Sequence, residues 1–410
     1  MKDEFEYMGG RAAPSLVAHR SEPGIGPTIG SVPPEAANAE IFVVTWQGTL
    51  TPRETSDYYL GFRGSGFFRV WIDGKLVTLA YHTDGVGMKL AHLHLEKDKP
   101  YALRVDYGPH KGSNPVAELV WSELDLRPSP EVVTASKEAD AIVAVVGLTS
   151  ELEGEEMAVS EEGFKGGDRT SLDLPKPEED LLEAVAAMGK PLVVVLLNGS
   201  ALSVNWAQAH ANAILDAWYP GEEGGAAVAQ TLAGVNNPAG RLPVTFYKSV
   251  ADLPAFEDYS MRNRTYRYFS GQLLYSFGYG LSYSKFEYSG VKLSSSNIKA
   301  GEALTVDADV KNVSARDGDE VVELYLTFPR LAGAPVRALC GFTRVHVGAG
   351  HAAHVQLSVK PRDLSYVSEA GDRLIAPGSY RISIGGGQPN TAAAPVEKEF
   401  TITGQARLPE

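Results

Sequence analysis

Several scarcities limit the classes of protein to which this 410-residue chain can belong. It has one cysteine, Cys340, so no disulfide can form within the chain. No apolar run approaches the ~20 residues that a membrane-spanning helix needs. The first ten residues, MKDEFEYMGG, lack the apolar centre of a secretory signal peptide. The formal net charge is -14, which argues against nucleic acid as a partner because binding phosphates requires a basic surface.

Common catalytic and cofactor motifs are scarce as well. The sequence contains neither a Walker-type phosphate loop nor a Gly-x-Ser-x-Gly elbow, and no motif indicates a cofactor. Cys340 is expected to be a small buried residue of a strand and not a catalytic thiol. His92 and His94 share one face of a predicted strand and could hold a metal ion, but no third ligand is in view. We therefore expect a hydrated strand surface there and no metal.

The first part of the chain, residues 1–126, predicts an all-β domain, which we call the N-terminal β module. Asp73-Gly74 is a type I′ hairpin signal between two apolar, alternating segments. Phe67, Phe68 and Trp71 could stack on a sugar, although aromatic residues in such a strand more often belong to the core. Short strands separated by turns indicate a sandwich or a barrel. The predicted strands cover residues 40–46, 56–62, 67–72, 75–78, 90–95, 101–107 and 117–121.

The middle part, residues 127–284, predicts an α/β domain. Residues 141–146 form an apolar, β-branched run that ends at Gly147, as in a strand buried on both faces. Pro177 opens a helical pattern, and residues 192–197 form a second apolar run. This order is a βαβ unit, so the two strands should be parallel. The apolar stripe of the helix consists of Leu181, Leu182, Val185 and Met188, and a third strand is expected at residues 213–218.

The last part, residues 285–410, predicts a second all-β domain. Apolar residues alternate with polar ones around Val306, Leu324, Leu357 and Ile382. The spacing of these segments is typical of an antiparallel sandwich of immunoglobulin type. The fold class is therefore multidomain α/β plus all-β.

Carboxylates are dense in residues 148–175, LTSELEGEEMAVSEEGFKGGDRTSLDLP, which we call the acidic loop. The loop leaves the carboxyl end of a predicted parallel strand, where open α/β sheets bind ligands. Gly166-Gly167-Asp168-Arg169 could pin it back through a charge pair. A carboxyl lodged in such a loop can act as a general acid, whereas the alternative is a solvated acidic surface. Its glutamates include Glu151, Glu153, Glu155, Glu156, Glu161 and Glu162.

An ordered set of motifs resembles a known family. The middle part of the chain looks like the α/β-sandwich domain of glycoside hydrolase family 3. The motifs that carry this resemblance are, in order, GLTSELEGEEM, GDR, LDLP, AWYPG, NPAGRLP, RTYRY and FGYGLSY. RALCGF resembles the signature of the fibronectin type III-like domain that commonly follows in that family. VTWQG, DYYLG, VWIDG and YALRVDY in the N-terminal β module resemble the protective-antigen-type β-sandwich, a module that often binds sugars or is inserted in glycosidases.

The resemblance implies a retaining β-glycosidase, in which two carboxyl groups flank the scissile bond. It implies that Glu155 is the general acid/base and that Glu153 orients it or contacts the sugar. Glu156 is the nearest rival for the catalytic role. Glucose is the expected terminal sugar of a β-linked oligosaccharide substrate, with xylose as the alternative. Without catalysis, the chain would be a carbohydrate-binding scaffold protein.

This sequence departs from the family pattern at one important point. The (β/α)₈ barrel that carries the family's nucleophilic Asp has no counterpart here. The one Ser-Asp-aromatic tripeptide that could carry this Asp, Ser56-Asp57-Tyr58, lies in the N-terminal β module and matches that module instead. The chain is therefore expected to be the C-terminal part of an enzyme, inactive without the barrel portion as a partner. We also expect a homo-oligomer to be possible, and a periplasmic or extracellular location.

Overall fold

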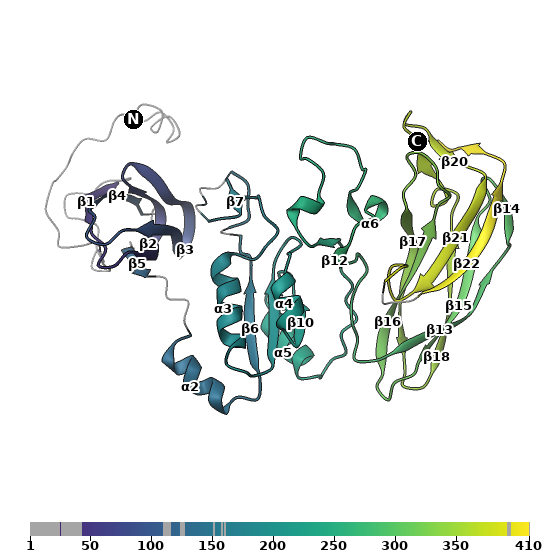
Figure 1. Cartoon of the computed structure of the whole chain (residues 1–410), viewed down its shortest axis with the longest axis horizontal. Coiled ribbons are helices and arrows are strands. Elements are labelled where there is room, and N and C mark those ends of the chain that lie inside the picture. The colour runs from purple at the N-terminus through teal and green to yellow at the C-terminus, as the bar shows by residue number, and fades with distance from the viewer. Residues whose placement is uncertain are drawn as a thin grey trace. The chain divides into compact units, whose positions relative to one another are not determined.

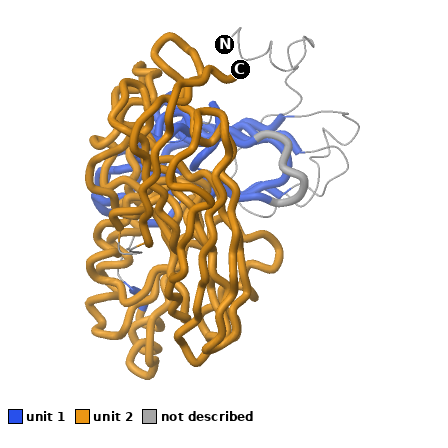
Figure 2. The backbone as a smooth tube through the Cα atoms, turned by 90° about the vertical axis from the view of Figure 1, so that its right-hand side faces the viewer, with its two compact units in different colours: residues 1–129, 149–170 blue, residues 130–148, 171–410 orange. Residues whose placement is uncertain are grey.

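The computed structural model describes residues 25, 43–109, 116–123, 128–150, 152–156, 159, 161–391 and 395–409, with only the backbone for residues 81–86 (Figure 1). The chain divides into two compact units (Figure 2). Unit 1 comprises Met1–Ser129 and Thr149–Thr170, and unit 2 comprises Pro130–Leu148 and Ser171–Glu410. Most of the acidic loop thus groups with the N-terminal β module. The domain boundaries inferred from the sequence, after residues 126 and 284, stay predictions.

The described part of the N-terminal β module forms a five-stranded antiparallel sheet. β2 is its central element: it pairs with β3 along its length, with β5 through its first half and with β4 through its second half. The core includes Leu60, Phe62, Phe68 and Val105. The strands are β1 Val44–Leu50, β2 Ser56–Ile72, β3 Lys75–Leu95, β4 Tyr101–Gly108 and β5 Ala117–Glu123.

The predicted hairpin at Asp73-Gly74 joins β2 to β3, and both residues have the positive φ angles, 50° and 77°, of a type I′ turn. The predicted division of the strands was wrong in one respect. The segments expected at 56–62 and 67–72 form one strand, and those expected at 75–78 and 90–95 form another. Register shifts let these long strands bend without ending, so glycines such as Gly64 and Gly66 are bulges and not turns.

The α/β part of unit 2 has the predicted parallel order, because β6 Ile142–Gly147 and β10 Ala213–Asp216 both pair in parallel with the central β9 Leu192–Leu197. The helix between β6 and β9 is α3 Lys176–Ala186, whose Leu182 and Val185 are buried. The stripe inferred from the sequence is partly wrong, since Leu181 is exposed. The other helices are α2 Pro130–Glu138, α4 Asn205–His210 and α5 Gly224–Leu232. Among the described residues, no helix is long and apolar enough to cross a membrane.

β6 is not buried on both faces, which corrects the expectation from its apolar run. Ala144 and Val146 are buried, whereas Val143 and Val145 are 49% and 56% exposed. β6 is an edge strand of this three-stranded sheet, and α3 packs against it. Within the residues that the structure describes, one face of β6 therefore stays open.

The irregular segment before the last domain contains only short elements, as its mixture of Tyr, Arg and Gly predicted. They are β11 Phe246–Tyr247, the 3₁₀ helix η2 Val250–Asp252, α6 Thr265–Tyr268 and β12 Leu273–Tyr275. β11 and β12 pair with each other. The 3₁₀ helix has a capping box in which the hydroxyl of Ser249 accepts from the Ala251 N–H and Asp252 accepts from the Ser249 N–H.

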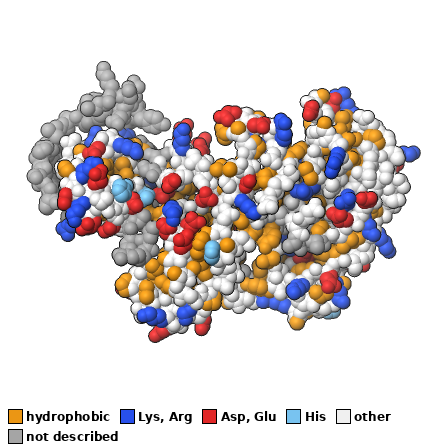
Figure 3. Space-filling model, in the orientation of Figure 1, with side chains coloured by type: hydrophobic (Ala, Val, Ile, Leu, Met, Phe, Trp, Pro, Cys, Tyr) orange, Lys and Arg blue, Asp and Glu red, His pale blue; other side chains and the backbone are white. Residues whose placement is uncertain are grey.

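The C-terminal all-β part is a sandwich of two main sheets, in the orders β13-β15-β18 and β14-β22-β21-β16-β17. Its core contains the predicted alternating residues, including Val306, Leu324 and Ile382, each fully buried. The main strands are β13 Phe286–Leu293, β14 Asn297–Lys299, β15 Leu304–Asn312, β16 Gly318–Thr327, β17 Arg337–Val347, β18 Ala352–Val359, β21 Gly378–Gly385 and β22 Val396–Thr403. The short strands are β19 Tyr366–Val367, β20 Arg373–Ile375 and β23 Ala406–Arg407. The molecule is therefore multidomain α/β plus all-β. On the face visible in Figure 3, acidic and basic side chains are interspersed.

Candidate active site

The acidic loop begins at a tightly packed strand end. Gly147 closes β6 with a φ of 144°, and a Cβ there would lie 1.9 Å from the carbonyl oxygen of Leu197. The next residue, Leu148, donates its N–H to that same carbonyl over 2.6 Å and is buried. The Gly147 N–H is bound by the carboxylate of Glu178 on α3 at 2.7 Å. The start of the loop is therefore fixed at the carboxyl end of β6 (Figure 1).

A short hairpin closes the acidic loop on itself. β7 Phe164–Lys165 pairs with β8 Asp168–Arg169 across Gly166-Gly167, which have φ angles of 64° and 90°. Two successive positive φ angles define a type I′ turn, which glycine adopts without strain. Gly167 also lies against the Gly154 backbone, where a Cβ would be 2.0 Å from the carbonyl oxygen.

The two glutamates assigned to the site lie in the turn 152–156, beside this hairpin. Glu153 is half-buried, and its Oε1 lies 4.0 Å from the Arg169 guanidinium, so the charge pair expected at GGDR exists. Glu155 and Glu156 are exposed, and Glu156 has a positive φ of 50°. Glu151 lies outside the described residues. An exposed carboxyl beside a pinned one suits a general acid with an orienting neighbour, and the assignment of these roles stays a prediction.

Glu161 is the loop carboxyl whose environment changes its acidity. Its side chain is 11% exposed. Burial raises its pKa, the nearby charge of Glu162 also raises it, and the charge of His92 in the N-terminal β module opposes both. No local pattern of residues distinguishes Glu161 from the other loop glutamates. Its position is revealed only by the packing of the loop on the module within unit 1.

Polar groups also gather at the carboxyl ends of β9 and β10 in unit 2. Asp216 ends β10, and burial raises its pKa to about 6, against the opposing effects of the Trp218 N–H and the Asn198 side chain. Asn198 follows β9 and is fully buried. Trp218 has a positive φ of 54°, which is strained for a bulky residue. Sequence reasoning missed Asp216, although an acidic residue at the carboxyl end of a parallel strand is a usable signal.

The weaker candidates from the sequence have structural explanations. Phe68 and Trp71 are buried, and the Arg104 guanidinium lies 4.5 Å from the centre of the Trp71 ring. Burial raises the pKa of the Cys340 thiol to about 12, which disfavours the reactive thiolate. His92 and His94 contact the carboxylate of Asp57. No cluster of three or more His, Cys, Asp or Glu side chains in the described part of the chain could hold a metal ion.

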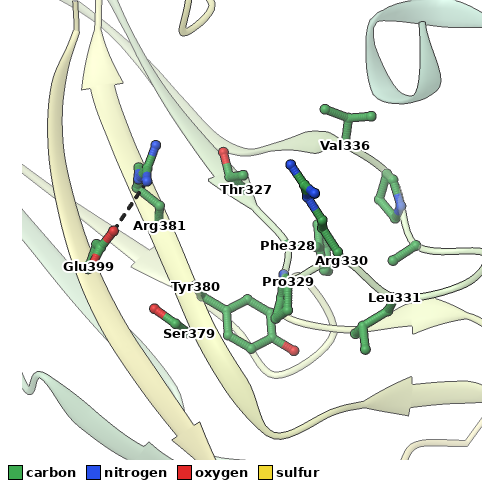
Figure 4. A pocket seen from close by; sticks show the side chains of 12 residues that line it. Thr327, Phe328, Pro329, Arg330, Leu331, Val336, Ser379, Tyr380, Arg381 and Glu399 are labelled. Carbon is green, nitrogen blue, oxygen red and sulfur yellow. Dashed lines mark hydrogen bonds and ion pairs between the residues drawn. The ribbon is translucent and has the colours of Figure 1, made fainter. Parts of the chain in front are cut away.

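A hollow of about 760 Å³ lies in the C-terminal sandwich, and none of these carboxylates lines it (Figure 4). Three of the side chains that line it are paired. Arg381 binds Glu399 at 3.2 Å, and the Tyr380 hydroxyl donates to the carbonyl of Ala376 at 2.8 Å. Nothing among the groups drawn there resembles an acid–base pair.

Comparison with known proteins agrees with this architecture. The profile of the glycosyl hydrolase family 3 C-terminal domain matches residues 34–283, and that of the fibronectin type III-like domain matches residues 320–388. The chain belongs to glycoside hydrolase family 3. The resemblance drawn from its motifs is confirmed.

Relatives of this chain include proteins named as β-xylosidases and β-glucosidases. A xylan 1,4-β-xylosidase from Xylanibacter ruminicola is 35% identical over 348 residues, which cover 84% of this chain and 40% of that protein. A β-glucosidase from Rhizobium radiobacter is 30% identical, with 84% and 45% covered. The crystal structure of a β-glucosidase from Streptomyces venezuelae in complex with D-glucose is similar with a TM-score of 0.69 and 26% identity, covering 87% of this chain and 46% of that one. The chain spans less than half the length of each of these relatives.

Proposed function

We propose that this chain supplies the general acid/base of a retaining, exo-acting β-glucosidase that removes terminal β-D-glucosyl residues from the non-reducing ends of oligosaccharides. The observation that carries the proposal is the acidic loop. It presents the exposed carboxyl of Glu155 from a turn that is closed by Gly154 and Gly167 and anchored by Gly147. Family membership supplies the reaction class.

In this mechanism Glu155 protonates the leaving oxygen and later activates water to release the sugar. Glu153, held near Arg169, orients Glu155 or contacts the sugar. The nucleophilic Asp comes from a (β/α)₈ barrel portion of the same enzyme, which the residues of this chain do not supply. We therefore expect the chain by itself not to hydrolyse glycosides, and to act in a periplasmic or extracellular enzyme.

The open face of β6 is an argument for a partner that covers it. Val143 and Val145 expose apolar surface on an edge strand, and such edges tend to pair or to be covered. We expect the barrel portion to cover this region in the complete enzyme. The chain alone is then expected to self-associate, which light scattering would reveal; a monodisperse monomer would contradict this expectation.

Xylose is the alternative terminal sugar, because one of the matched relatives is a xylan 1,4-β-xylosidase and another is a β-glucosidase. Activity of the assembled enzyme on aryl β-glucosides and aryl β-xylosides separates the two. The other alternative is a non-catalytic carbohydrate-binding scaffold, which has no need of the acidic loop.

The deciding experiment replaces Glu155 by Ala in the enzyme assembled with its barrel portion. Loss of a general acid costs about 10²–10⁴-fold in rate, most of all for poor leaving groups such as sugar alkoxides. With a nitrophenyl glycoside the first step needs little proton help, so the covalent intermediate should accumulate. Azide needs no base, so it should restore turnover and yield a glycosyl azide.

Glu156→Ala is the matched control, because Glu156 is the exposed neighbour in the same turn. It should retain activity and show no azide rescue, and Glu153→Ala should lose activity without azide rescue. Azide rescue of either control in place of Glu155→Ala would move the acid/base to that carboxylate. Unchanged activity in all three variants would refute the catalytic reading and favour the scaffold.

A further inference from the structure

A polar patch on the N-terminal β module faces the acidic loop. In the pairing of β2 with β3, Asp57 lies opposite His94 and Tyr59 lies opposite His92. Residues two apart on a strand share a face, so these four side chains form one patch. Asp57 is its acidic member, and its Oδ1 lies 3.0 Å from His94 Nδ1 and 3.7 Å from His92 Nε2.

His92 also reaches the loop. Its Nδ1 lies 4.0 Å from Oε2 of Glu161, so the imidazole stands between one carboxylate of the module and one of the loop. His92 is 25% exposed, whereas the neighbouring His94 is 62% exposed and contacts Asp57, with no ion pair to the loop residues that the structure describes. The patch therefore contains one histidine that bridges to the loop and one that does not.

The partly buried carboxyl of Glu161 needs such a neighbour. An ionised carboxylate is costly to bury unless a cation or hydrogen-bond donors compensate it. The charges that act on Glu161 are those of His92, which favours its ionised form, and of Glu162, which disfavours it.

Backbone hydrogen bonds connect Glu161, through the β7–β8 hairpin, to the turn 152–156. The Glu161 carbonyl accepts from the Phe164 N–H, which begins β7 of the hairpin. In the turn of this hairpin, just before β8, the Gly167 carbonyl accepts from the Gly154 N–H, between Glu153 and Glu155. A displacement of Glu161 would therefore move the turn that carries both carboxylates.

We infer that His92 holds the acidic loop on the N-terminal β module by bridging Asp57 and Glu161, and that it is thereby a positioning residue for the carboxylates of the turn 152–156. The contact is independent of the reaction, whereas its catalytic consequence rests on the proposed function. The module accordingly contributes to the active site by fixing the loop, beyond any sugar it binds.

The test is hydrogen–deuterium exchange of the full chain at constant pH, followed in peptides that cover residues 149–170. His92→Gln should speed exchange there by about three- to tenfold, the effect of losing a modest pairwise coupling. His94→Gln is the matched control and should leave the loop peptides unchanged. His92→Lys places a cation beside Glu161 and should restore most of the protection.

Glu161→Gln should speed exchange as His92→Gln does, and the double variant should add little, because the two residues act through one contact. Equal effects of His92→Gln and His94→Gln, additive effects in the double variant, or no change in any loop peptide would overturn the inference. In the assembled enzyme, His92→Gln should lower kcat more for poor leaving groups than for nitrophenolate, with KM little changed. If Glu155 is not the general acid/base, the hydrogen-exchange results are still expected to hold. The catalytic proposal for Glu155 and the positioning proposal for His92 can therefore be refuted independently.

Discussion

Two groups of carboxylates in this molecule have opposite environments. Glu155 and Glu156 in the acidic loop are exposed to solvent. Glu320 and Glu323 on β16 are buried at 3% and 3% exposure, where the C-terminal sandwich meets the α/β part inside unit 2. The first group is conspicuous in the sequence as a cluster, whereas the second is an unremarkable pair in an alternating strand.

Both carboxylates of the buried group have hydrogen-bond partners, and this indicates a structural role. The Arg241 guanidinium binds Oε2 of Glu320 at 3.0 Å, and the Tyr288 hydroxyl donates to Oε1 at 2.7 Å. The Tyr325 hydroxyl donates to Glu323 at 2.7 Å. Burial raises the pKa of Glu323 to about 7. A perturbed pKa therefore marks a structural junction here, and exposure with a supporting loop is the better guide to the site.

Among the variants that test this contrast between exposed and buried carboxylates, Arg241→Met is expected to change stability the most. The side chains of Arg241 and Glu320 are 9% and 5% exposed, so the variant leaves a carboxylate buried without its cation. Loss of one partner of a buried pair costs about 3–5 kcal/mol in the free energy of unfolding. Urea denaturation of the full chain measures it, and the loss should shrink at low pH, where Glu320 becomes neutral.

Arg344→Met is the control for that variant. Arg344 binds Asp319 at 2.6 Å, but its side chain is 63% exposed, and surface pairs contribute only about 0–1 kcal/mol. Equal destabilisation by the two variants would mean that the junction around Glu320 behaves as a solvated surface. Adding Glu320→Gln to Arg241→Met should recover part of the lost stability.

The next effect concerns the pH dependence of stability and arises from Glu323. Its pKa is about 7 in the folded chain against a reference of 4.5, so the folded state binds the proton more tightly. The stabilisation is present below pH 4.5 and is lost as the pH rises to about 7, on the order of 3 kcal/mol at ~1.4 kcal/mol per unit. Glu323→Gln should remove this slope and raise the melting temperature at pH 8 relative to the natural chain. An unchanged slope would show that Glu323 is accessible to water.

Much of the fold could be predicted because its signals are local. The βαβ order, the helix opening at Pro177 and the hairpin at Asp73-Gly74 depend on residues close together in the chain. Exposure of Val143 and Val145 could not be predicted, since an apolar run does not reveal whether both faces of a strand are covered. The long, bent β2 was missed because glycines that usually mark turns here mark bulges.

The candidate site divides in the same way. Glu153 and Glu155 follow from a contiguous motif, and the pairing of Glu153 with Arg169 lies within the loop itself. Glu161 and His92 are far apart in the sequence, and only the packing of the loop on the N-terminal β module brings them together. Contacts of this kind depend on tertiary structure, which residue patterns do not encode locally.

The smallest expected effect tests whether Asp216 belongs with the exposed or with the buried carboxylates. Its Oδ2 and the Oδ1 of Asn198 are both buried, and neither finds a hydrogen-bond donor among the described residues. Burial favours the neutral carboxyl and raises the pKa of Asp216 from 3.8 to about 6, whereas the Trp218 N–H and the Asn198 side chain lower it.

On that basis the stability contributed by protonated Asp216 is present below pH 3.8 and is lost as the pH rises through about 6. Asp216→Asn supplies a permanent N–H donor, so it should stabilise the chain modestly at pH 7 and above and have little effect at pH 4. Thermal unfolding of the full chain at the two pH values measures the difference, with Asp168→Asn as the control because Asp168 is an exposed loop carboxyl. Destabilisation by Asp216→Asn at pH 7 would mean that the ionised carboxylate is what the Trp218 turn requires, through the bond from the Trp218 N–H at 3.2 Å. Asp216 would then act as a charged anchor of the strand end, unlike the protonated carboxyl expected at Glu323.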